Sequence, residues 1–282
     1  MPRRFPIWAG DRPDSDTRPR RSTLMPTLAD TAPTCVVRGL SFDAVTAALV
    51  RGRATVFTLN MMHMRLLARN PEFRESYRQA SIVTLDSNLL NICFLRRRMT
   101  VATGSDLVRH LSARRSLRDR SVLVIGNVTR EEAGAVMASR QLDVLRPPFG
   151  FIHDPEAVEA VVAQVQAIAP DVIFIAVGAP QSEILALRLR RAGLAAPSIL
   201  ACGAAFEFVL GKQSRSPVAL RRIGLEWAWR LAGNPRRLAG RYARDAGFLL
   251  SMLGPLTRLA RSGAVKVGGL QLQFRQEAGV GA

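Results

Sequence analysis

The sequence predicts an α/β fold built on an open, mostly parallel sheet with helices on both faces. Short β-rich runs alternate with helical patterns from about residue 36 onward. Glycine and polar residues follow these runs, at the points where the strands of a parallel sheet end. A chain of 282 residues is long enough for one sizeable domain of this kind plus an appendage. Together these features predict a Rossmann-like sheet.

The strands are expected at 55–59, 81–85, 121–125, 142–145, 171–177 and 198–202. Helices are expected around 43–50, 63–79, 104–114, 131–140, 155–168 and 183–192. Thr129, followed three residues later by Glu132, predicts a capping box at the start of the fourth helix. No internal repeat of the solenoid kind is found.

Composition divides the chain into four parts. Residues 1–33 are rich in proline, arginine and aspartate and predict a disordered tail, followed by the α/β domain at 34–211. We expect a basic helical appendage at 212–262 and a flexible glycine-rich tail at 263–282. No run approaches the roughly 18–20 apolar residues of a spanning helix, so a peripheral or soluble protein is expected.

The chain is strongly basic, with 40 Lys and Arg against 22 Asp and Glu and a formal charge of +18. This balance predicts an anionic partner: nucleotide phosphates, anionic lipid or nucleic acid. The scattered residues Cys35, Cys93 and Cys202 lack metal-ligand spacing and are expected to be buried thiols. His63, His110 and His153 show no paired-ligand spacing, so no metal is assigned.

The stretch GLEWAWRLAGNPRRLAGRY at 224–242 carries aromatic side chains, a break at Asn234–Pro235 and a series of arginines. A helix that begins after this break would place Arg237 and Arg241 on one face. Such a helix could simply have a solvated basic side. The other interpretations are an anchor on the membrane surface, a nucleic-acid arm and a clamp for phosphates.

Polar residues at the ends of the predicted strands are the candidates for a site. Asp86 follows the run 81–85 and could act as a general base, with a helix N-cap as the alternative. Thr58 and Asn60 could bind a sugar or a pyrophosphate, or serve only in the turn and cap before the next helix. The loop from Thr103 through Gly104 to Asp106 could contact a nucleotide or only cap its helix.

The later strands are followed by further residues of this kind, namely Gly126, Gly178, Gln181, Glu183 and Gly203. Ligands of open α/β sheets bind beyond the carboxyl ends of the strands, where glycine admits the ligand and helix N-termini attract phosphate. The sequence contains neither GxGxxG nor the P-loop pattern, and it has no GxSxG nucleophile elbow.

Taken together, these motifs resemble the WecG/TagA/CpsF family of glycosyltransferases. The resemblance runs from about residue 36 to about residue 250 and covers most of the chain. Its motifs are TLN at 58–60, LDS at 85–87, TGSDL at 103–107, GAPQSE at 178–183, GAAFEFVLGKQSRSP at 203–217 and the stretch at 224–242. The last of these is the most specific in content and position.

The resemblance implies residue roles. Asp86 matches the proposed general base, Thr58 and Asn60 match residues of the sugar pocket, and Gly178 matches a nucleotide-side loop. Thr103, Gly104 and Asp106 match a loop of the same region. The arginines implied to meet the diphosphate and the membrane are Arg215, Arg222, Arg230, Arg237 and Arg241. Ser87 stands where the family usually has glycine, and this predicts a backbone less free to adopt positive φ.

The family resemblance implies transfer of a sugar from a UDP-sugar to a polyprenyl-diphosphate-linked acceptor during surface-polysaccharide assembly. We expect an inverting enzyme without metal or other cofactor, because no DxD-like acidic pair ends a strand. It would act at the cytoplasmic face of the membrane, without a nucleic-acid partner; a homo-oligomer is left open. The alternative is a non-enzymatic basic protein that binds nucleotides or nucleic acid.

Overall fold

The computed structural model describes residues 32–214 and 216–277, with nine strands in one sheet. The sheet order is β5-β4-β6-β7-β2-β3-β1-β9-β8, and all pairings are parallel except that of β8 with β9. The strands are β1 (Thr34–Gly39), β2 (Thr55–Leu59), β3 (Ile82–Leu85), β4 (Ser121–Gly126), β5 (Gln141–Leu145), β6 (Val172–Ala176), β7 (Ser198–Ala201), β8 (Ala264–Val267) and β9 (Leu270–Gln276). The predicted α/β class with an open, mostly parallel sheet is confirmed.

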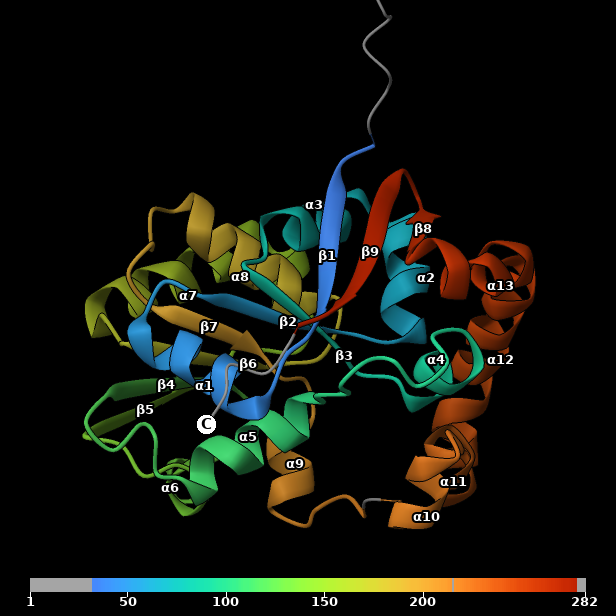
Figure 1. Cartoon of the computed structure of the whole chain (residues 1–282). Coiled ribbons are helices and arrows are strands. Elements are labelled where there is room, and N and C mark those ends of the chain that lie inside the picture. Colours follow the sequence, from blue (N-terminus) through green and yellow to red (C-terminus); the bar gives the residue numbers. More distant parts are fainter. Residues whose placement is uncertain (1–31, 215, 278–282) are drawn as a thin grey trace, which may run out of the picture. The chain divides into compact units, whose positions relative to one another are not determined.

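Helices cover both faces of this sheet (Figure 1). The first eight are α1 (Phe42–Arg51), α2 (Met61–Arg69), α3 (Pro71–Gln79), α4 (Asn88–Cys93), α5 (Gly104–Ala113), α6 (Arg130–Val136), α7 (Pro155–Ile168) and α8 (Gln181–Arg191). The later helices are α9 (Ala205–Val209), α10 (Val218–Arg222), α11 (Glu226–Gly233), α12 (Pro235–Ser251) and α13 (Leu253–Ser262), and the 3-10 turn η1 spans Phe151–His153.

Two hydrophobic layers hold the helices on the sheet. One layer contains side chains of α1, α5, α6 and α9, and the other contains side chains of α2, α3, α7, α8 and α13. In β4, Val122 and Val124 face the first layer while Leu123 and Ile125 face the second, as the alternation of a strand requires. Central strands that are buried on both faces read as continuous apolar runs, which is why they could be recognised from sequence.

Side-chain caps fix where the helices begin. Asn60, Ser87 and Thr103 accept backbone hydrogen bonds at the starts of α2, α4 and α5. The expected capping box is present, with Thr129 and Glu132 bonded to each other's backbone. The helix expected over 63–79 is divided at Asn70 because Pro71 begins a new helix, α3.

The expected flexible tail at 263–282 is wrong for its described part. Residues 264–267 and 270–276 form a hairpin, and β9 pairs along the whole of β1. Apolar residues alternate with polar ones in β9, so Leu270, Leu272 and Phe274 are buried while the two glutamines between them are partly exposed. Residues 278–282 lie outside the described residues. The same is true of residues 1–31, which make up nearly all of the tail expected at 1–33.

The appendage, residues 212–262, contains α10 to α13 and belongs to the same compact unit as the sheet. The helices α10 and α11 have no buried residues, whereas α13 buries Leu256 and Leu259 in the hydrophobic layer of α2. The segment therefore begins as an exposed arm and ends as part of the core. Within the described residues, no helix is both long and apolar enough to cross a bilayer.

Candidate active site

Asp86, Thr58 and Asn60 lie together where β2 and β3 end. Thr58 pairs with Thr84 in the parallel register, so the first residues after the two strands are neighbours. The Thr58 hydroxyl lies 3.4 Å from Oδ2 of Asp86, and the side chain of Asn60 also hydrogen-bonds this carboxylate. The sheet register therefore gathers three residues that the sequence predicted to be in the site.

Asp86 is not a helix cap. The cap of α4 is Ser87, whose hydroxyl accepts from the Leu90 amide at 3.2 Å. Ser87 has φ −156° and ψ 103°, an extended conformation that any residue adopts, so the serine in place of glycine imposes no strain at this turn. The cap interpretation of Asp86 is thereby wrong, and its carboxylate lines a cavity.

The environment of Asp86 favours the protonated carboxyl. Burial raises its pKa to about 7, and the negative charge of Glu226 adds to the rise. Arg230 opposes this effect by favouring the carboxylate. An acid whose pKa lies near neutrality can accept a proton and release it again under physiological conditions.

A buried hydrogen-bond network stabilises the end of β2. The Tyr77 hydroxyl donates to the Thr58 carbonyl at 2.6 Å, and Nδ1 of His63 lies 2.6 Å from the same oxygen. Burial lowers the pKa of His63 to about 4, so its imidazole is neutral at physiological pH. These residues stabilise the strand end on which Thr58 and Asn60 stand.

The loop before α5 forms the next part of the wall. Thr103 is its cap: its hydroxyl accepts from the Asp106 amide at 3.1 Å and donates to the Asp106 carboxylate at 2.8 Å. Gly104 packs on the end of β7, where an added Cβ would lie 2.9 Å from the Cys202 carbonyl oxygen. Glycine is required here by this close approach, which holds the N-terminus of α5 beside the central strands.

A cavity of about 400 Å³ opens between these strand ends and the appendage. Asn60, Asp86 and Thr103 line it from the sheet side, while Arg230 and Arg241 line it from the appendage. Its remaining lining residues are Met61, Met62, Ser87, Asn88, Leu89, Gly224, Glu226, Trp227, Tyr242, Asp245, Ala246 and Leu249. The appendage thus supplies one wall of the cavity that contains the candidate base.

The arginines expected to form a clamp are found in different places. Arg230 is held between the Glu226 carboxylate and the ring of Phe208, whose centroid lies 4.8 Å from its guanidinium carbon. Arg222 lines a second, neighbouring cavity. Arg215 and the side chain of Arg237 lie outside the described residues.

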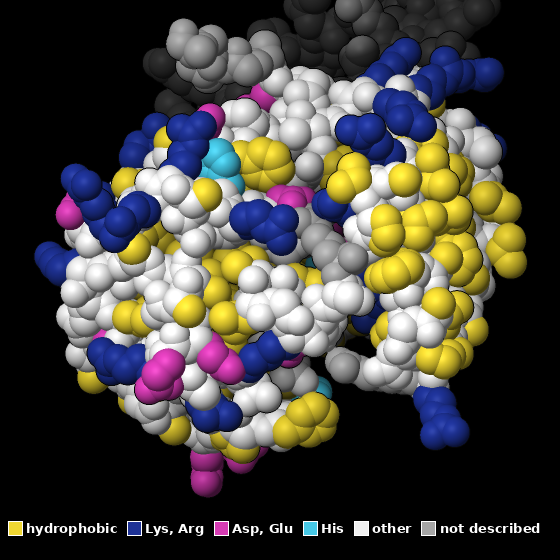
Figure 2. Space-filling model, turned by 90° about the horizontal axis from the view of Figure 1, so that it is seen from below, with side chains coloured by type: hydrophobic (Ala, Val, Ile, Leu, Met, Phe, Trp, Pro, Cys, Tyr) yellow, Lys and Arg dark blue, Asp and Glu magenta, His cyan; other side chains and the backbone are white. Residues whose placement is uncertain are grey.

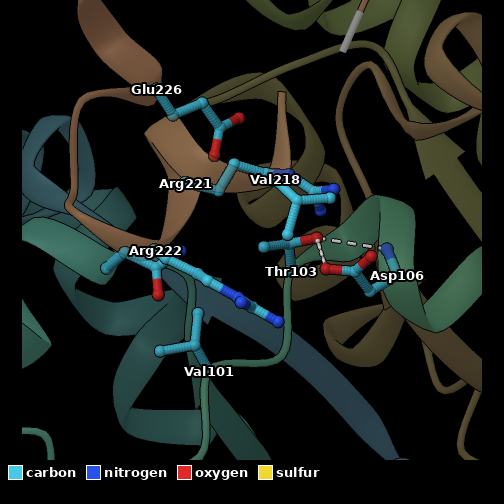
Figure 3. A pocket seen from close by; sticks show the side chains of 8 residues that line it. Val101, Thr103, Asp106, Val218, Arg221, Arg222 and Glu226 are labelled. Atoms are coloured by element: carbon cyan, nitrogen blue, oxygen red, sulfur yellow. Dashed lines mark hydrogen bonds between the residues drawn. The ribbon is translucent and has the colours of Figure 1, made fainter. Parts of the chain in front are cut away.

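The second cavity has a volume of about 190 Å³ (Figure 3). Arg221 and Arg222 extend from α10 toward Thr103 and Asp106 on the opposite wall. Its other lining residues are Asn88, Val101, Val218 and Glu226. Nε of Arg221 is buried and has no hydrogen-bond partner in the described part of the chain.

Sequence analysis did not single out Arg221, although it lies beside Arg222. The two arginines are adjacent in a short helix, and their spacing alone does not indicate which one faces the sheet. Glu226 was missed as well, because its effect on Asp86 depends on a contact between distant segments. The turn before α11 makes this contact: an added Cβ on Gly224, which has φ +80°, would lie 3.3 Å from the Leu89 Cα.

Five predicted residues line neither of the two cavities. Gly126 is the last residue of β4, while Gly178, Gln181 and Glu183 follow β6 and Gly203 follows β7. Gly178 has φ +84° in the loop that leads to α8. Glu183 is only 3% exposed, one of its carboxylate oxygens has no partner among the described residues, and burial raises its pKa to about 7. Their role as a donor-side wall stays a prediction.

The structure also locates the cysteines and the tryptophans of the stretch at 224–242. Cys35 and Cys202 are buried free thiols, whereas Cys93 is exposed, so the expectation of buried thiols is wrong at Cys93. Trp227 and Trp229, at 40% and 39% exposure, are not core residues. No group of three or more His, Cys, Asp or Glu that could hold a metal ion occurs among the described residues.

A carboxylate with a near-neutral pKa, placed at the carboxyl edge of a parallel sheet and faced by arginines, is an arrangement suited to group transfer from a phosphorylated donor. The sequence comparison identifies the family. The model of the Glycosyl transferase WecG/TagA/CpsF family matches residues 34–262, from β1 to the end of α13. The chain therefore belongs to this family, and membership implies a glycosyltransferase of surface-polysaccharide biosynthesis.

Proposed function

We propose that the protein moves a sugar from a UDP-sugar to a polyprenyl-diphosphate-linked saccharide, with inversion and without a metal ion. The observation that carries the proposal is Asp86, whose pKa is raised to about 7 in a cavity that Arg230 and Arg241 also line. Asp86 can take a proton from the acceptor hydroxyl, while Arg230 and Arg241 can bind the negatively charged diphosphate of the donor. The reaction would take place at the cytoplasmic face of the membrane during assembly of a surface or extracellular polysaccharide.

In the proposed step, the Asp86 carboxylate takes the proton of an acceptor hydroxyl. The acceptor oxygen forms a bond to the anomeric carbon from the face opposite the nucleotide. The bond between that carbon and the diphosphate oxygen breaks, and UDP leaves with the electron pair. Because the attack is a single displacement, the anomeric configuration inverts.

The departing UDP carries negative charge, and fixed positive charge would stabilise it. Arg230 and Arg241 reach the larger cavity, and Arg221 and Arg222 reach the smaller one. Arg215 and Arg237 would extend this clamp. In this account the arginines and the N-terminus of α5 provide the charge stabilisation that a divalent ion provides in other nucleotide-sugar enzymes.

The remaining predicted residues would bind and orient the substrates. Thr58 and Asn60 hold the Asp86 carboxylate, and we assign both to the sugar pocket; Asn60 lines the larger cavity, whereas Thr58 is buried behind it. Thr103, Gly104 and Asp106 would form the loop beside them. On the donor side we assign a wall to Gly126, Gly178, Gln181, Glu183 and Gly203. Their position at the carboxyl end of β4, or after the ends of β6 and β7, supports this assignment.

The surface of the appendage supports contact with a membrane. Figure 2 shows apolar side chains gathered on one side of the molecule, with Lys and Arg nearby. The exposed large apolar residues of the appendage, which we call the apolar patch, are Val218, Ile223, Leu225, Trp227, Trp229, Leu250 and Leu253. Apolar side chains and tryptophan next to cationic residues are typical of helices that lie in a membrane interface. A polyprenyl acceptor remains in the bilayer, so the enzyme would have to reach it there.

Calorimetry with UDP, followed by UDP release from a panel of UDP-sugars, tests the proposal. We expect UDP to bind, and one member of the panel to release UDP when a short-chain polyprenyl-diphosphate saccharide is present. Mass spectrometry of that acceptor should show one added sugar. Binding of nucleic acid with a steep loss of affinity in salt, and no UDP binding, would contradict the proposal and favour a basic nucleic-acid-binding protein.

A further inference from the structure

An ion pair between Arg65 and Asp245 joins α2 to the appendage helix α12. Nε of Arg65 lies 2.6 Å from Oδ1 of Asp245, and the two side chains are only 11% and 10% exposed. By comparison, the Arg188–Glu72 pair elsewhere in the molecule has side chains 29% and 36% exposed. A buried pair resists solvent and salt screening far better than an exposed one.

The pair connects two walls of the larger cavity. On α2, Arg65 lies five positions after Asn60. Asn60 caps this helix and hydrogen-bonds the Asp86 carboxylate. On α12, Asp245 lies four positions, about one turn, after Arg241, and Asp245 and Arg241 both line the cavity. A contact at this place sets the distance between the candidate base and the appendage.

The segment that carries the clamp arginines has few other attachments. Between Gly224, which packs on Leu89, and Asp245, no side chain that the structure describes is buried. Beyond Asp245 the attachments increase, because Phe248, Leu256 and Leu259 enter the core. Residues 225–244 therefore form a loop of helices that is held at its two ends and, between them, by the contact of Arg230 with Phe208. Asp245 holds the second end.

Arg241 depends on this attachment for its position. Its Nε is buried and has no hydrogen-bond partner within the described residues, and its guanidinium carbon lies 4.9 Å from the centre of the neighbouring Tyr242 ring. No hydrogen bond at Nε fixes its direction, so the placement of α12 largely determines where it points. We propose that Arg65 and Asp245 are positioning residues, whose ion pair holds residues 225–244 over the cavity and keeps Arg241 directed into it.

Hydrogen exchange on the full chain tests this directly. In Arg65→Met and in Asp245→Asn, amides of 225–244 should exchange about tenfold faster than in the wild type, while those of β4 and β6 should be unchanged. The charge-swapped double variant Arg65→Asp with Asp245→Arg should restore slow exchange. Glu72→Gln breaks the more exposed pair and should leave 225–244 unaffected. Arg65→Lys keeps the charge and should exchange at nearly the wild-type rate. If Asp245→Asn does not fold, Arg65→Met decides the outcome alone.

Calorimetry with UDP provides a second measurement, and this one rests on the proposed function. The single variants should weaken UDP binding by about tenfold, and the swap should recover most of the loss. Exchange in 225–244 that stays within twofold of the wild type in both single variants, or that rises equally throughout the chain, would overturn the positioning role. A wild-type protein that does not bind UDP would instead contradict the proposed function, while the exchange result would still decide the role of the ion pair.

Discussion

The Thr58 hydroxyl lies 3.4 Å from Oδ2 of Asp86, across the ends of two adjacent parallel strands. Neither strand alone could place this pair. The carboxylate is positioned by the sheet register on one side and by the turn into α4 on the other. It then faces a wall that comes from the appendage, about 140 residues later in the chain.

The pKa of Asp86 predicts the pH dependence of turnover. The carboxylate must be deprotonated to accept a proton, and its pKa is raised to about 7 by burial and by Glu226. Turnover should therefore rise with pH through about 7 and level off above it. Glu226→Gln removes a negative charge and should move this midpoint to lower pH. Steady-state rates between pH 5 and 9 measure both, and a profile that is flat across pH 7 would contradict the assignment.

The same raised pKa makes the ionised Asp86 costly to the fold. The folded state holds this proton up to about pH 7, whereas the unfolded chain releases it near pH 4. The contribution of the protonated Asp86 to the free energy of unfolding is therefore at its full value below about pH 4. It is lost as the pH rises through 7. Asp86→Asn should be more stable than the wild type above pH 7, by about 1–2 kcal/mol for a half-buried group, and equal to it near pH 4. Urea unfolding at the two pH values measures this difference.

Arg230 should contribute to binding of the diphosphate. Arg230→Met keeps an unbranched chain to pack on Phe208 but removes the charge that faces the cavity. A charged hydrogen bond contributes about 1.5–3 kcal/mol, so the Kd for UDP should rise roughly 10- to 100-fold. Arg118→Met, whose arginine is 73% exposed and ion-paired with Asp119, serves as the control. Equal UDP affinity in both variants would remove Arg230 from the clamp.

The apolar patch should direct the protein to membranes. Ile223, Trp229 and Leu250 are exposed and do not line the larger cavity, so replacing all three by serine tests surface contact without altering that cavity. We expect binding to phosphatidylcholine vesicles that contain phosphatidylglycerol to fall at least about tenfold, because less apolar surface is buried. Phe149→Ser, at a still more exposed apolar site outside the appendage, should bind like the wild type. Cosedimentation that is unchanged in the triple variant would contradict membrane docking by this patch.

The central strands were predictable because burial on both faces leaves continuous apolar runs, as in TVFTL at 55–59. Strands β1, β8 and β9 were missed for the opposite reason. They are short or half-buried, and β9 acquires its register only by pairing with β1, more than 230 residues earlier in the chain. A glycine-rich turn at Gly268–Gly269 looks like a flexible tail until a partner strand is known.

Within the site, local signals identified the residues that follow strands, such as Asn60 and Asp86. Sequence could not distinguish the cap from the base at Asp86 and Ser87, because both residue types cap helices well. It also could not show that Glu226 and Arg221 face the sheet. Those contacts depend on how the appendage packs against the ends of the strands, which the local sequence does not encode.

The most direct test of the role of Asp86 uses the Asp86→Asn variant. It measures the rate at which this variant releases UDP from the preferred donor when acceptor is present. The amide keeps the shape of the side chain but cannot take the acceptor's proton, so turnover should fall at least about 100-fold. UDP affinity should stay within a fewfold of the wild type. Asp119→Asn, an exposed carboxylate distant from the cavity, should retain full activity. Turnover in Asp86→Asn equal to that of the wild type would contradict the account.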